Sequence, residues 1–449
     1  MPKKIVIIGG GICGLACAHR LLKSNLNVTL LEASDQLGGL GTFFQYEDAW
    51  IDRFYHCVMP NDKHLLKLMA EVGLAERIYW EPTQMGFIVA GKHYAFNTPV
   101  DLLRFTAIPL AHRIRLGVMS LLLRKLGEGK DLDNLPTQDF LTKIFGKRIW
   151  ENFWQPLFKS KFGPHAGSLP SLYLWQRLGR EKNVATRGYL TGGLKRFIDE
   201  MEKSILRRGG KIIKNHPVAA FHETSTGVIL TCADGSEIAA DWVICTAPMP
   251  LVRELIRNSS FEGKYKDAEL QAQGVVNALF FLKRPLENHY WTPVVNSGTG
   301  FDGVVEMSAL VDKRQYAGHH LAYVMKYCDR NSTFFKMNDR DIIQQWTKDF
   351  LMLYRDLPLT KQDIVDVRLF KAPFVEPVYP LGYLEKKPGF QVGDSHLLLA
   401  NTSQVYPDIT SWNASSRLAC EVVDFLRMKL LAGQPCEPRN ESHAVKLDQ

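Results

Sequence analysis

The segment from Ile5 to Glu32 constrains the fold more than any other part of the chain. It begins with an apolar, β-branched run of the length expected for a strand buried on both faces. A glycine-rich turn, a helix and a second strand follow in that order. Gly9, Gly11 and Gly14 form the pattern G-x-G-x-x-G where the helix must begin, and Glu32 closes the second strand. This order predicts a dinucleotide-binding unit.

Each part of the pattern has a physical role. Gly9 permits the tight turn, Gly11 leaves room for the backbone to approach a pyrophosphate, and Gly14 lets the helix and strand pack closely. The helix directs its free N–H groups and positive dipole end at that phosphate. Glu32 is placed to accept hydrogen bonds from ribose hydroxyls. Because an acid there disfavours a ribose phosphate, the pattern indicates FAD or NAD rather than NADP.

A second glycine pair, Gly38-Gly39, follows closely and adds a backbone-lined surface near the same ligand. The runs GGGICGLACAHRLL and VTLLEASDQLGGLGTF together resemble the extended FAD signature of the flavin amine oxidase, protoporphyrinogen oxidase and phytoene desaturase superfamily. Members usually carry Arg after the glycine pair, whereas this chain has Leu40 followed by Gly41. The resemblance therefore implies FAD, held here by backbone rather than by an arginine side chain.

The resemblance also implies cofactor contacts in three later segments. The residue matching Val218 contacts the adenine side through its backbone, and Pro248 ends a strand beside the flavin. Relatives close the site with a Gly-Asp or Gly-Glu pair and a helix whose N-terminus faces the flavin, where its dipole stabilises negative charge. This chain has different residues at both places. The corresponding positions are Asn401, Thr402, Asn413 and Ala414.

Three residues are candidates for catalysis. His56 lies, with the further candidate site residue Tyr55, in a stretch that in relatives leads toward the ring end of the flavin; a loop histidine with a structural hydrogen bond is the alternative. Glu306 lies where relatives of the bacterial group carry Glu-His-Thr, and Lys326 lies in the predicted strand 320–327. A buried acid in such a sheet is either a proton carrier, an anchor for a substrate, or a paired structural acid.

The chain has 449 residues, which exceeds a single core and predicts several lobes. We expect an α/β fold: a discontinuous Rossmann-like FAD-binding lobe, a mixed α+β substrate lobe and a helical insert. The predicted boundaries are 1–97, 188–250 and 385–433 for the FAD-binding lobe, 98–187 for the insert, 251–384 for the substrate lobe and 434–449 for a loose tail.

The insert is rich in aromatic residues, and no uncharged stretch within 99–126 reaches the length needed to span a membrane. A basic, apolar helix pair broken near Pro109 fits either a helical lid or a peripheral contact with a membrane surface. Relatives in the protoporphyrinogen oxidase branch use an insert at this place to meet the bilayer. Lys161, Arg177 and Arg187 lie among aromatics that suit either a cavity with an anionic end or a buried core.

The net charge of +8 comes from no compact basic block, so nucleic acid is not an expected partner, whereas anionic substrates or lipid head groups are. The eight cysteines include no C-x-x-C pair and no zinc spacing, which predicts no metal site. With a strand directly after the N-terminus, we expect a cytoplasmic protein, peripheral on the membrane at most. The oligomeric state is left open.

The chain carries one dinucleotide fingerprint, so we expect an organic substrate to reduce the flavin directly. The leading hypothesis is an FAD-dependent oxidase, dehydrogenase or desaturase that moves a hydride from a C–H bond of an apolar or amphipathic substrate, such as a lipid, isoprenoid or porphyrin-like molecule, to flavin N5. One alternative is an isomerase similar to UDP-galactopyranose mutase, with Arg177 and Arg187 gripping a pyrophosphate. Another is a non-catalytic FAD-bound scaffold.

Overall fold

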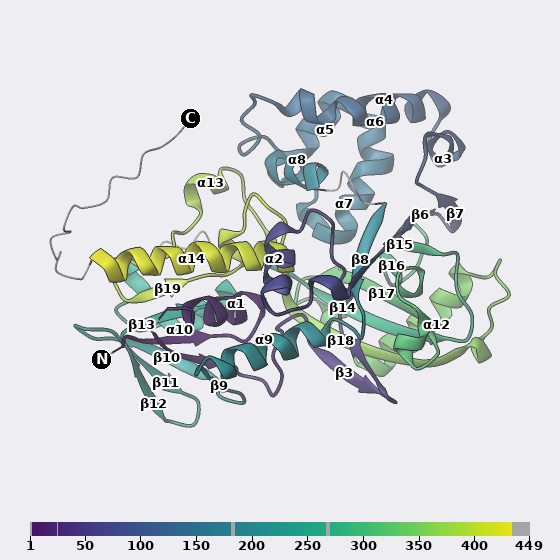
Figure 1. Cartoon of the computed structure of the whole chain (residues 1–449). Coiled ribbons are helices and arrows are strands. Elements are labelled where there is room, and N and C mark those ends of the chain that lie inside the picture. The colour runs from purple at the N-terminus through teal and green to yellow at the C-terminus, as the bar shows by residue number, and fades with distance from the viewer. Residues whose placement is uncertain (1, 25, 181–184, 266–269, 433–449) are drawn as a thin grey trace, which may run out of the picture.

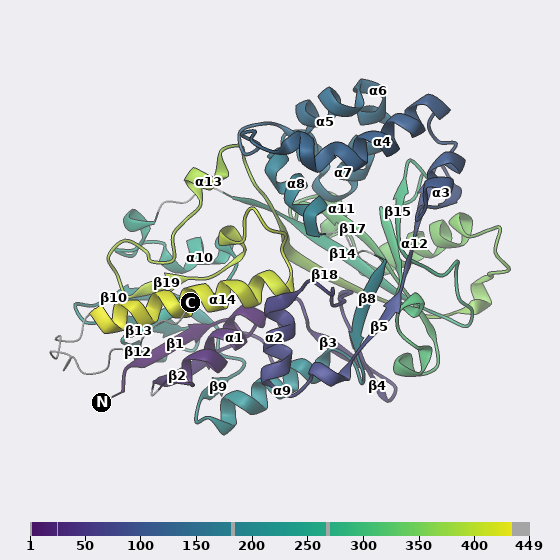
Figure 2. The same ribbon diagram turned by 45° about the horizontal axis from the view of Figure 1, so that its top comes forward.

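A computed structural model describes residues 2–24, 26–180, 185–265 and 270–432. A parallel sheet forms the centre of one end of the molecule, a larger mixed sheet lies beside it, and a helical insert caps the far end (Figures 1 and 2). The mixed α/β class predicted above is confirmed. The predicted tail 434–449 lies outside the described residues.

The parallel sheet has the strand order β19-β13-β1-β2-β9, so three segments distant in sequence build it. Its apolar strands are buried because layers cover both faces. Helices α1, α2, α9 and α14 pack on one face, and α10 with the small sheet β10-β11-β12 packs on the other. The strands are β1 Lys4–Ile8, β2 Asn27–Leu31, β9 Lys211–Ile213, β13 Trp242–Cys245, β19 Leu397–Leu399, β10 Val218–Glu223, β11 Val228–Cys232 and β12 Glu237–Ala240.

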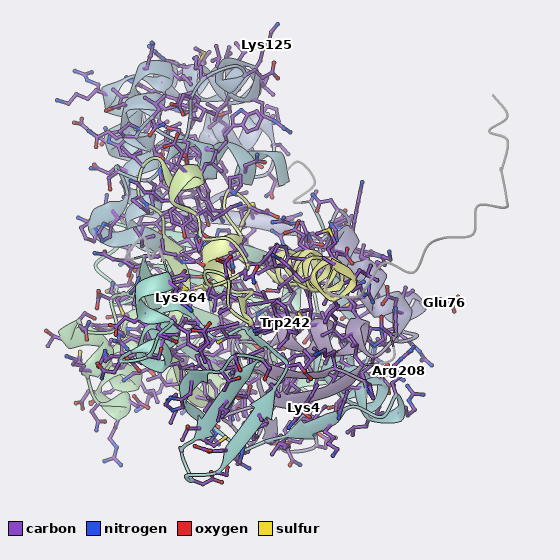
Figure 3. All side chains as sticks on the ribbon, turned by 90° about the vertical axis from the view of Figure 1, so that its left-hand side faces the viewer. Lys4, Glu76, Lys125, Arg208, Trp242 and Lys264 are labelled. Atoms are coloured by element: carbon purple, nitrogen blue, oxygen red, sulfur yellow. The ribbon has the colours of Figure 1, made fainter. Side chains whose placement is uncertain are left out.

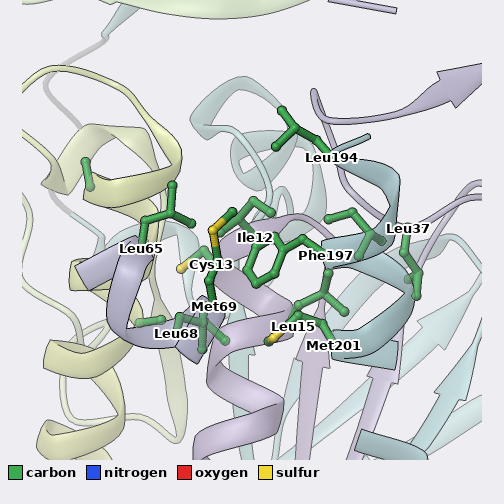
Figure 4. Close-up of a cluster of buried hydrophobic side chains, with 14 of the residues drawn as sticks. Ile12, Cys13, Leu15, Leu37, Leu65, Leu68, Met69, Leu194, Phe197 and Met201 are labelled. Atoms are coloured by element: carbon green, nitrogen blue, oxygen red, sulfur yellow. The ribbon is translucent and has the colours of Figure 1, made fainter. Parts of the chain in front are cut away.

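Side chains from three helices interlock on the first face (Figure 4). Phe197 and Met201 of α9, Leu15 of α1 and Met69 of α2 are all fully buried there. This packing holds α1, and with it the glycine turn at its start, against the sheet. The helices are α1 Ile12–Leu21, α2 Lys63–Glu71, α9 Lys195–Arg207, α10 Met249–Ile256 and α14 Trp412–Ala432.

The second sheet has the order β18-β14-β17-β16-β15-β6-β7. Along β14, Val275, Leu279 and Phe281 face the parallel sheet and its helices, whereas the even-numbered residues pack on helix α12. This alternation decides which side chains of the large sheet can reach the glycine turn's side of the molecule. The elements are β6 Gln84–Val89, β7 Lys92–Ala95, β14 Gln271–Leu282, β15 His289–Val295, β16 Gly303–Glu306, β17 His320–Cys328, β18 Ile364–Val378, α11 Thr333–Lys336, α12 Asp339–Leu353 and α13 Tyr383–Lys386.

The insert leaves the large sheet after β7 and returns through β8, which pairs with β5. Its helices enclose an aromatic core that includes Phe105, Phe153 and Trp154. No helix in the described part of the chain is long and apolar enough to cross a membrane. The elements are α3 Pro99–Arg104, α4 Leu110–Gly127, α5 Thr137–Phe145, α6 Lys147–Ile149, a π-helical turn Trp150–Trp154, α7 Gln155–Phe162, α8 Ser171–Arg180, and the two-stranded pairs β3 Phe43–Tyr46 with β4 Ala49–Asp52 and β5 Ile78–Pro82 with β8 Thr186–Leu190.

Replacing Phe197 by alanine tests the packing of Figure 4. We expect a loss of about 3–5 kcal/mol in the free energy of unfolding, because a buried aromatic ring leaves a cavity behind. Leu206→Ala at a half-exposed position of the same helix is the control and should change it by less than about 0.5 kcal/mol. Urea unfolding followed by fluorescence measures both, and equal losses would contradict the assignment.

Candidate FAD and substrate site

The glycine turn has the geometry that a bound pyrophosphate requires. Gly9 has φ +99°, a conformation that residues with a side chain rarely adopt. A Cβ on Gly14 would lie 1.9 Å from the carbonyl oxygen of Gly9, so helix and turn touch only because no side chain is present. A Cβ on Gly11 would meet only the Cα of Gly39, at 3.8 Å. The space in front of Gly11 is therefore open.

Glu32 is fastened to this turn by its own carboxylate. Oε2 accepts from the backbone N–H of Gly10 at 2.6 Å, and Oε1 accepts from the N–H and hydroxyl of Ser34, both at 2.8 Å. The side chain stays half-exposed, as a group that accepts from ribose hydroxyls must. Backbone bonds from Asn215 to Ser34 and from His216 to Glu32, each 2.9 Å, bring Val218 to the same end of the site.

The two glycine loops lie edge to edge. The N–H of Gly38 donates to the carbonyl of Gly10 at 2.8 Å, and Gly11 and Gly38 form a parallel β-bridge. Gly38 and Gly39 have φ +120° and +62°. Leu40 packs on the apolar core, and a Cβ on Gly41 would lie 2.4 Å from the Trp412 ring. The double loop thus offers backbone alone to the cofactor.

The segments expected to close the site meet at the seam between the two sheets. Pro248 and Thr402 line a narrow pocket together with Glu376 of β18. The Asn401 side chain is committed to its own turn, since its Oδ1 accepts from the N–H and hydroxyl of Ser403. Thr402, which follows it, is the residue of the predicted pair that lines the pocket.

The helix α14 begins near the seam, but its first side chains have other partners. The Oδ1 of Asn413 accepts from the backbone N–H groups of His64 and Leu65, at 2.9 and 3.2 Å, and so caps α2. Ala414 is fully buried in the core. Both side chains are therefore occupied elsewhere, and only the backbone of these two residues is available for the predicted contact with FAD. The dipole at the start of α14 is unaffected by this arrangement.

These observations together test whether the residues fit FAD. The turn opens in front of Gly11, an anchored acid stands at the ribose position, and a second loop free of side chains lies alongside. The chain could not pass so close to a pyrophosphate with side chains at these glycines. The residues therefore fit the diphosphate and ribose of FAD.

His56 lies beside the start of α14, with its ring 4.9 Å from the Trp412 ring. Its Nδ1 lies 2.8 Å from the carbonyl oxygen of Phe54, which fixes that nitrogen as the N–H donor and leaves Nε2 with a lone pair. Burial lowers the pKa of His56 to about 4. The imidazole is thus neutral near pH 7 and able to accept a proton.

Glu306 and Lys326 lie on the opposite face of the large sheet from His56. They share the strand parity of Val304 and Val324, which pack against α12. The Oε1 of Glu306 accepts from the N–H of Leu286 at 2.8 Å, and Lys326 forms a 3.2 Å ion pair with Asp302. The structure therefore does not bring these two candidates together with His56. A loop anchor and a surface ion pair describe them better than catalytic groups.

The face opposite α12 carries an aromatic cluster, of which the sequence singled out Tyr55 as a candidate site residue but not its neighbours. Tyr55 stacks on Trp291, with 6.3 Å between ring centroids, and lies 6.2 Å from the Tyr323 ring. Burial raises the pKa of Tyr55, opposed by its hydrogen bond with Tyr327 and by the nearby charge of Arg177. The sequence signal that could have revealed this cluster is the pair of tyrosines at odd-numbered positions of the strand 320–328, Tyr323 and Tyr327.

Charged side chains border this cluster on the side of the insert. Lys161 forms a 3.0 Å ion pair with the buried Glu376, to which the Tyr173 hydroxyl also donates a hydrogen bond. The Arg187 guanidinium lies 4.4 Å above the Tyr290 ring. Lys161 and Arg187 are thus close to the cluster, as one of the two sequence interpretations proposed. The combination suits a molecule with an apolar body and a polar end.

Asp52 is a second buried acid near the cluster. Tyr189 donates its hydroxyl to Oδ2 at 2.5 Å, and Tyr323 donates to the backbone carbonyl of Asp52 at 2.8 Å. Oδ1 is buried without a hydrogen-bond partner. Burial raises the pKa of Asp52 to about 7, although the Tyr189 hydrogen bond opposes that rise. A large part of this carboxyl group is therefore protonated near neutral pH.

One group in the described part of the chain has the composition of a metal site. His216, Cys232 and Asp234 place one ligand atom each within 4.8 Å of one another on the small sheet. An oxygen of Asp234 accepts from the N–H and hydroxyl of Ser236, which accounts for its position without an ion. The group lies in the turn region of β11 and β12, and we assign it no metal.

The fold and site define a flavoprotein oxidoreductase of mixed α/β fold. The family model for flavin containing amine oxidoreductases matches residues 12–408, so the chain belongs to that family, and its cofactor is FAD. The chain is 22% identical over 401 residues to 15-cis-phytoene desaturase of Solanum lycopersicum, covering 83% of this chain and 68% of that one. It is 24% identical over 347 residues to coproporphyrinogen III oxidase of Bacillus subtilis, covering 68% of each.

A solved structure shares the fold along nearly the whole chain. An oxidoreductase from Methanosarcina mazei superposes with a TM-score of 0.72 at 17% identity, covering 94% of this chain and 100% of that one. At this identity the likeness concerns the fold alone. The predicted family, cofactor and enzyme class are confirmed, whereas the assignments of individual site residues stay predictions.

Two glycine variants separate cofactor binding from folding. Gly11→Ala should abolish FAD retention while changing the stability of the cofactor-free protein by about 1 kcal/mol or less, because its Cβ meets open space. Gly14→Ala should cost about 2–3 kcal/mol or more, because its Cβ meets the carbonyl of Gly9. Flavin absorbance per protein and urea unfolding measure the two effects. Retention of FAD by Gly11→Ala would contradict the proposed pyrophosphate site.

The raised pKa of Asp52 makes stability depend on pH. Between pH 4 and 7 the folded protein keeps a proton that an unfolded aspartate, with its pKa of 3.8, has lost. The free energy of unfolding therefore falls as pH rises through this window, by up to roughly 4 kcal/mol. Asp52→Asn should remove that fall, whereas Asp35→Asn at an exposed site should not. Parallel pH profiles for wild type and Asp52→Asn would contradict the prediction.

Proposed function

We propose that the chain catalyses direct oxidation of an amphipathic organic substrate, as an oxidase, dehydrogenase or desaturase. The observation that carries the proposal is the aromatic cluster around Tyr55, bordered by Lys161 and Glu376, on the sheet face turned toward the FAD-binding lobe. Within the described ranges the chain has a single parallel sheet. No second nucleotide-binding lobe is therefore present there to bring a nicotinamide to the flavin.

The cofactor, when bound, supplies the acceptor for a hydride from a C–H bond of the substrate. The protein holds the substrate in position and limits access of water. The rings of Tyr55 and Trp291 support the apolar body, and the border formed by Lys161, Glu376 and Arg187 holds the polar end. A substrate of this kind is consistent with the enzymes named among the relatives, a desaturase and a porphyrinogen oxidase.

When a C–H bond of the substrate gives up its hydride, a neighbouring N–H, O–H or C–H bond loses a proton as the new double bond forms, and His56 is the side chain best prepared to accept that proton. Its Nδ1–H is fixed on the Phe54 carbonyl, and its lowered pKa keeps Nε2 unprotonated. We therefore propose His56 as the proton acceptor and withdraw Glu306 and Lys326 from that role, because both face α12.

Anaerobic mixing of the FAD-loaded enzyme with candidate amines, porphyrinogens and polyprenoids tests the reaction. The proposal expects loss of the oxidised flavin absorbance with one of these classes and not with NADPH. Turnover of a nucleotide sugar only after reduction by dithionite, without net oxidation, would replace it by the isomerase alternative.

Variants of His56 and of Glu306 test the assignment of the proton acceptor. His56→Gln should slow flavin reduction by about 10²–10⁴-fold, whereas Glu306→Gln should leave it within about twofold. Since the pKa of His56 is about 4, the wild-type rate should stay level from pH 8 down to pH 5. A decline centred near pH 6.5, or equal effects of the two substitutions, would remove His56 from this role.

A further inference from the structure

Helices α3 and α4 carry a continuous apolar face that nothing in the described structure covers. We call this set of side chains the α3–α4 face. Each member is between 43% and 87% exposed, and Leu121 is the most exposed large apolar residue of the described chain. Other exposed large apolar residues are spread over distant elements. The face consists of Val100, Leu103, Leu110, Ile114, Val118, Leu121 and Leu122.

The spacing places these residues on one side of α4. Leu110, Ile114 and Val118 follow at intervals of four, and Leu121 and Leu122 continue the stripe one turn later. The opposite side of the helix is already used, because Leu116 and Leu123 are buried in the insert core. A helix with a packed apolar side and a second, exposed one has more apolar surface than its own fold requires. A stripe this long marks an interaction site.

The charges around the stripe indicate the chemistry of the partner. Residues 102–127 contain no Asp or Glu but five Lys and Arg. Arg104, Arg115 and Lys125 are exposed beside the apolar side chains. Arg113 has a different task, because its Nε donates to the carbonyl of Ile108 at 2.9 Å and steadies the bend before α4. Asp101 in α3 and Glu128 after α4 are the acids next to this range, so the cations outnumber the acids around the stripe. An apolar stripe with a predominantly cationic border matches a surface of anionic lipids.

The same charges disfavour a second copy of the chain as the partner. A two-fold symmetric contact through this face would place a cationic border against an identical one. Like charges would then meet with no acid of residues 102–127 to neutralise them. The charges are therefore complementary to an anionic surface and not to themselves.

The position of the face in the molecule allows contact with a plane. Helix α4 runs along the outer edge of the insert in Figure 1, away from the parallel sheet, and α3 flanks it on the side of β6 and β7. Lys125 lies at the extreme of the molecule in Figure 3, well away from Lys4 and Trp242. Neither lobe protrudes beyond α4 on this side. A flat surface can thus reach the stripe without meeting the rest of the protein.

We propose that the α3–α4 face docks the enzyme on the surface of an anionic bilayer. Helix α4 lies in the plane of the membrane, with Ile114 and Leu121 in the acyl boundary and Arg104 and Lys125 at the phosphates. Its length and charge suit this orientation and not a span. The proposal is independent of the reaction proposed above, because it rests only on residues outside the catalytic site.

Vesicle sedimentation of the full, FAD-loaded chain tests the proposal. Wild type should bind vesicles of phosphatidylcholine with phosphatidylglycerol at least tenfold more tightly than vesicles of phosphatidylcholine alone, and added salt should weaken the binding. Ile114→Glu with Leu121→Glu should reduce the binding at least tenfold. Leu206→Glu with Met428→Glu, at similarly exposed positions elsewhere, should leave it unchanged. Flavin content and circular dichroism show that every variant is folded.

The charge variants and the oligomeric state complete the test. Arg104→Gln and Lys125→Gln should each weaken binding to the anionic vesicles by about fivefold and leave binding to neutral vesicles unaltered. Hydrogen exchange on vesicles should show protection confined to residues 99–126. Absence of binding to anionic vesicles would overturn the proposal. A dimer in solution that Ile114→Glu with Leu121→Glu converts to monomer would assign the face to a second copy instead.

Discussion

The structure depends on the close approach of two glycine loops that are separate in sequence. The hydrogen bond from Gly38 to Gly10 and the bridge between Gly11 and Gly38 bring the two backbones so close that a Cβ on Gly39 would lie 3.2 Å from the Cα of Gly11. Glu32 ties the first loop to the end of β2, and α1 ties it to the apolar packing of Figure 4. A shift in the core packing would therefore move the glycine loops, and a shift of the loops would disturb the core packing.

The second determinant is the alternation of side chains along the large sheet. One set of residues packs on α12 and builds an apolar layer, while the other set meets the FAD-binding lobe and includes Tyr323. Successive side chains along a strand of this sheet thus point alternately toward α12 and toward the side of the proposed site. His56 lies against the Trp412 ring at the start of α14, and Lys161 comes from the insert. The site that we propose therefore draws on three parts of the chain.

The features that could be predicted from the sequence are those whose structure is determined by local residue spacing and backbone sterics. The turn at Gly9–Gly14, the acid Glu32 and the final helix follow from spacing and backbone sterics, and they were correctly placed. Glu306 and Lys326 look like site residues in sequence, but strand parity within an assembled sheet sends them to α12. Asn413 was expected at the cofactor, yet its side chain caps α2, a helix some 350 residues earlier. Such partners are tertiary, and no local pattern reveals them.

The ends of the helical insert lie close together, and this has an evolutionary consequence. The chain enters the insert after β7, where the N–H of Phe96 donates to Met85, and it returns to β8 beside Thr83, whose N–H donates to Ala185. Strand β8 then pairs with β5 from Ile78 with Leu190 to Pro82 with Thr186. The β5–β8 pair fastens the returning chain, and the insert core also packs on Phe87, Tyr379 and Tyr406, which lie outside the insert. Selection can remodel that module, its core and its outer surface, without disturbing the glycine loops. Diversity of substrate and location within a family can arise by exchanging the module while the cofactor lobe is inherited intact.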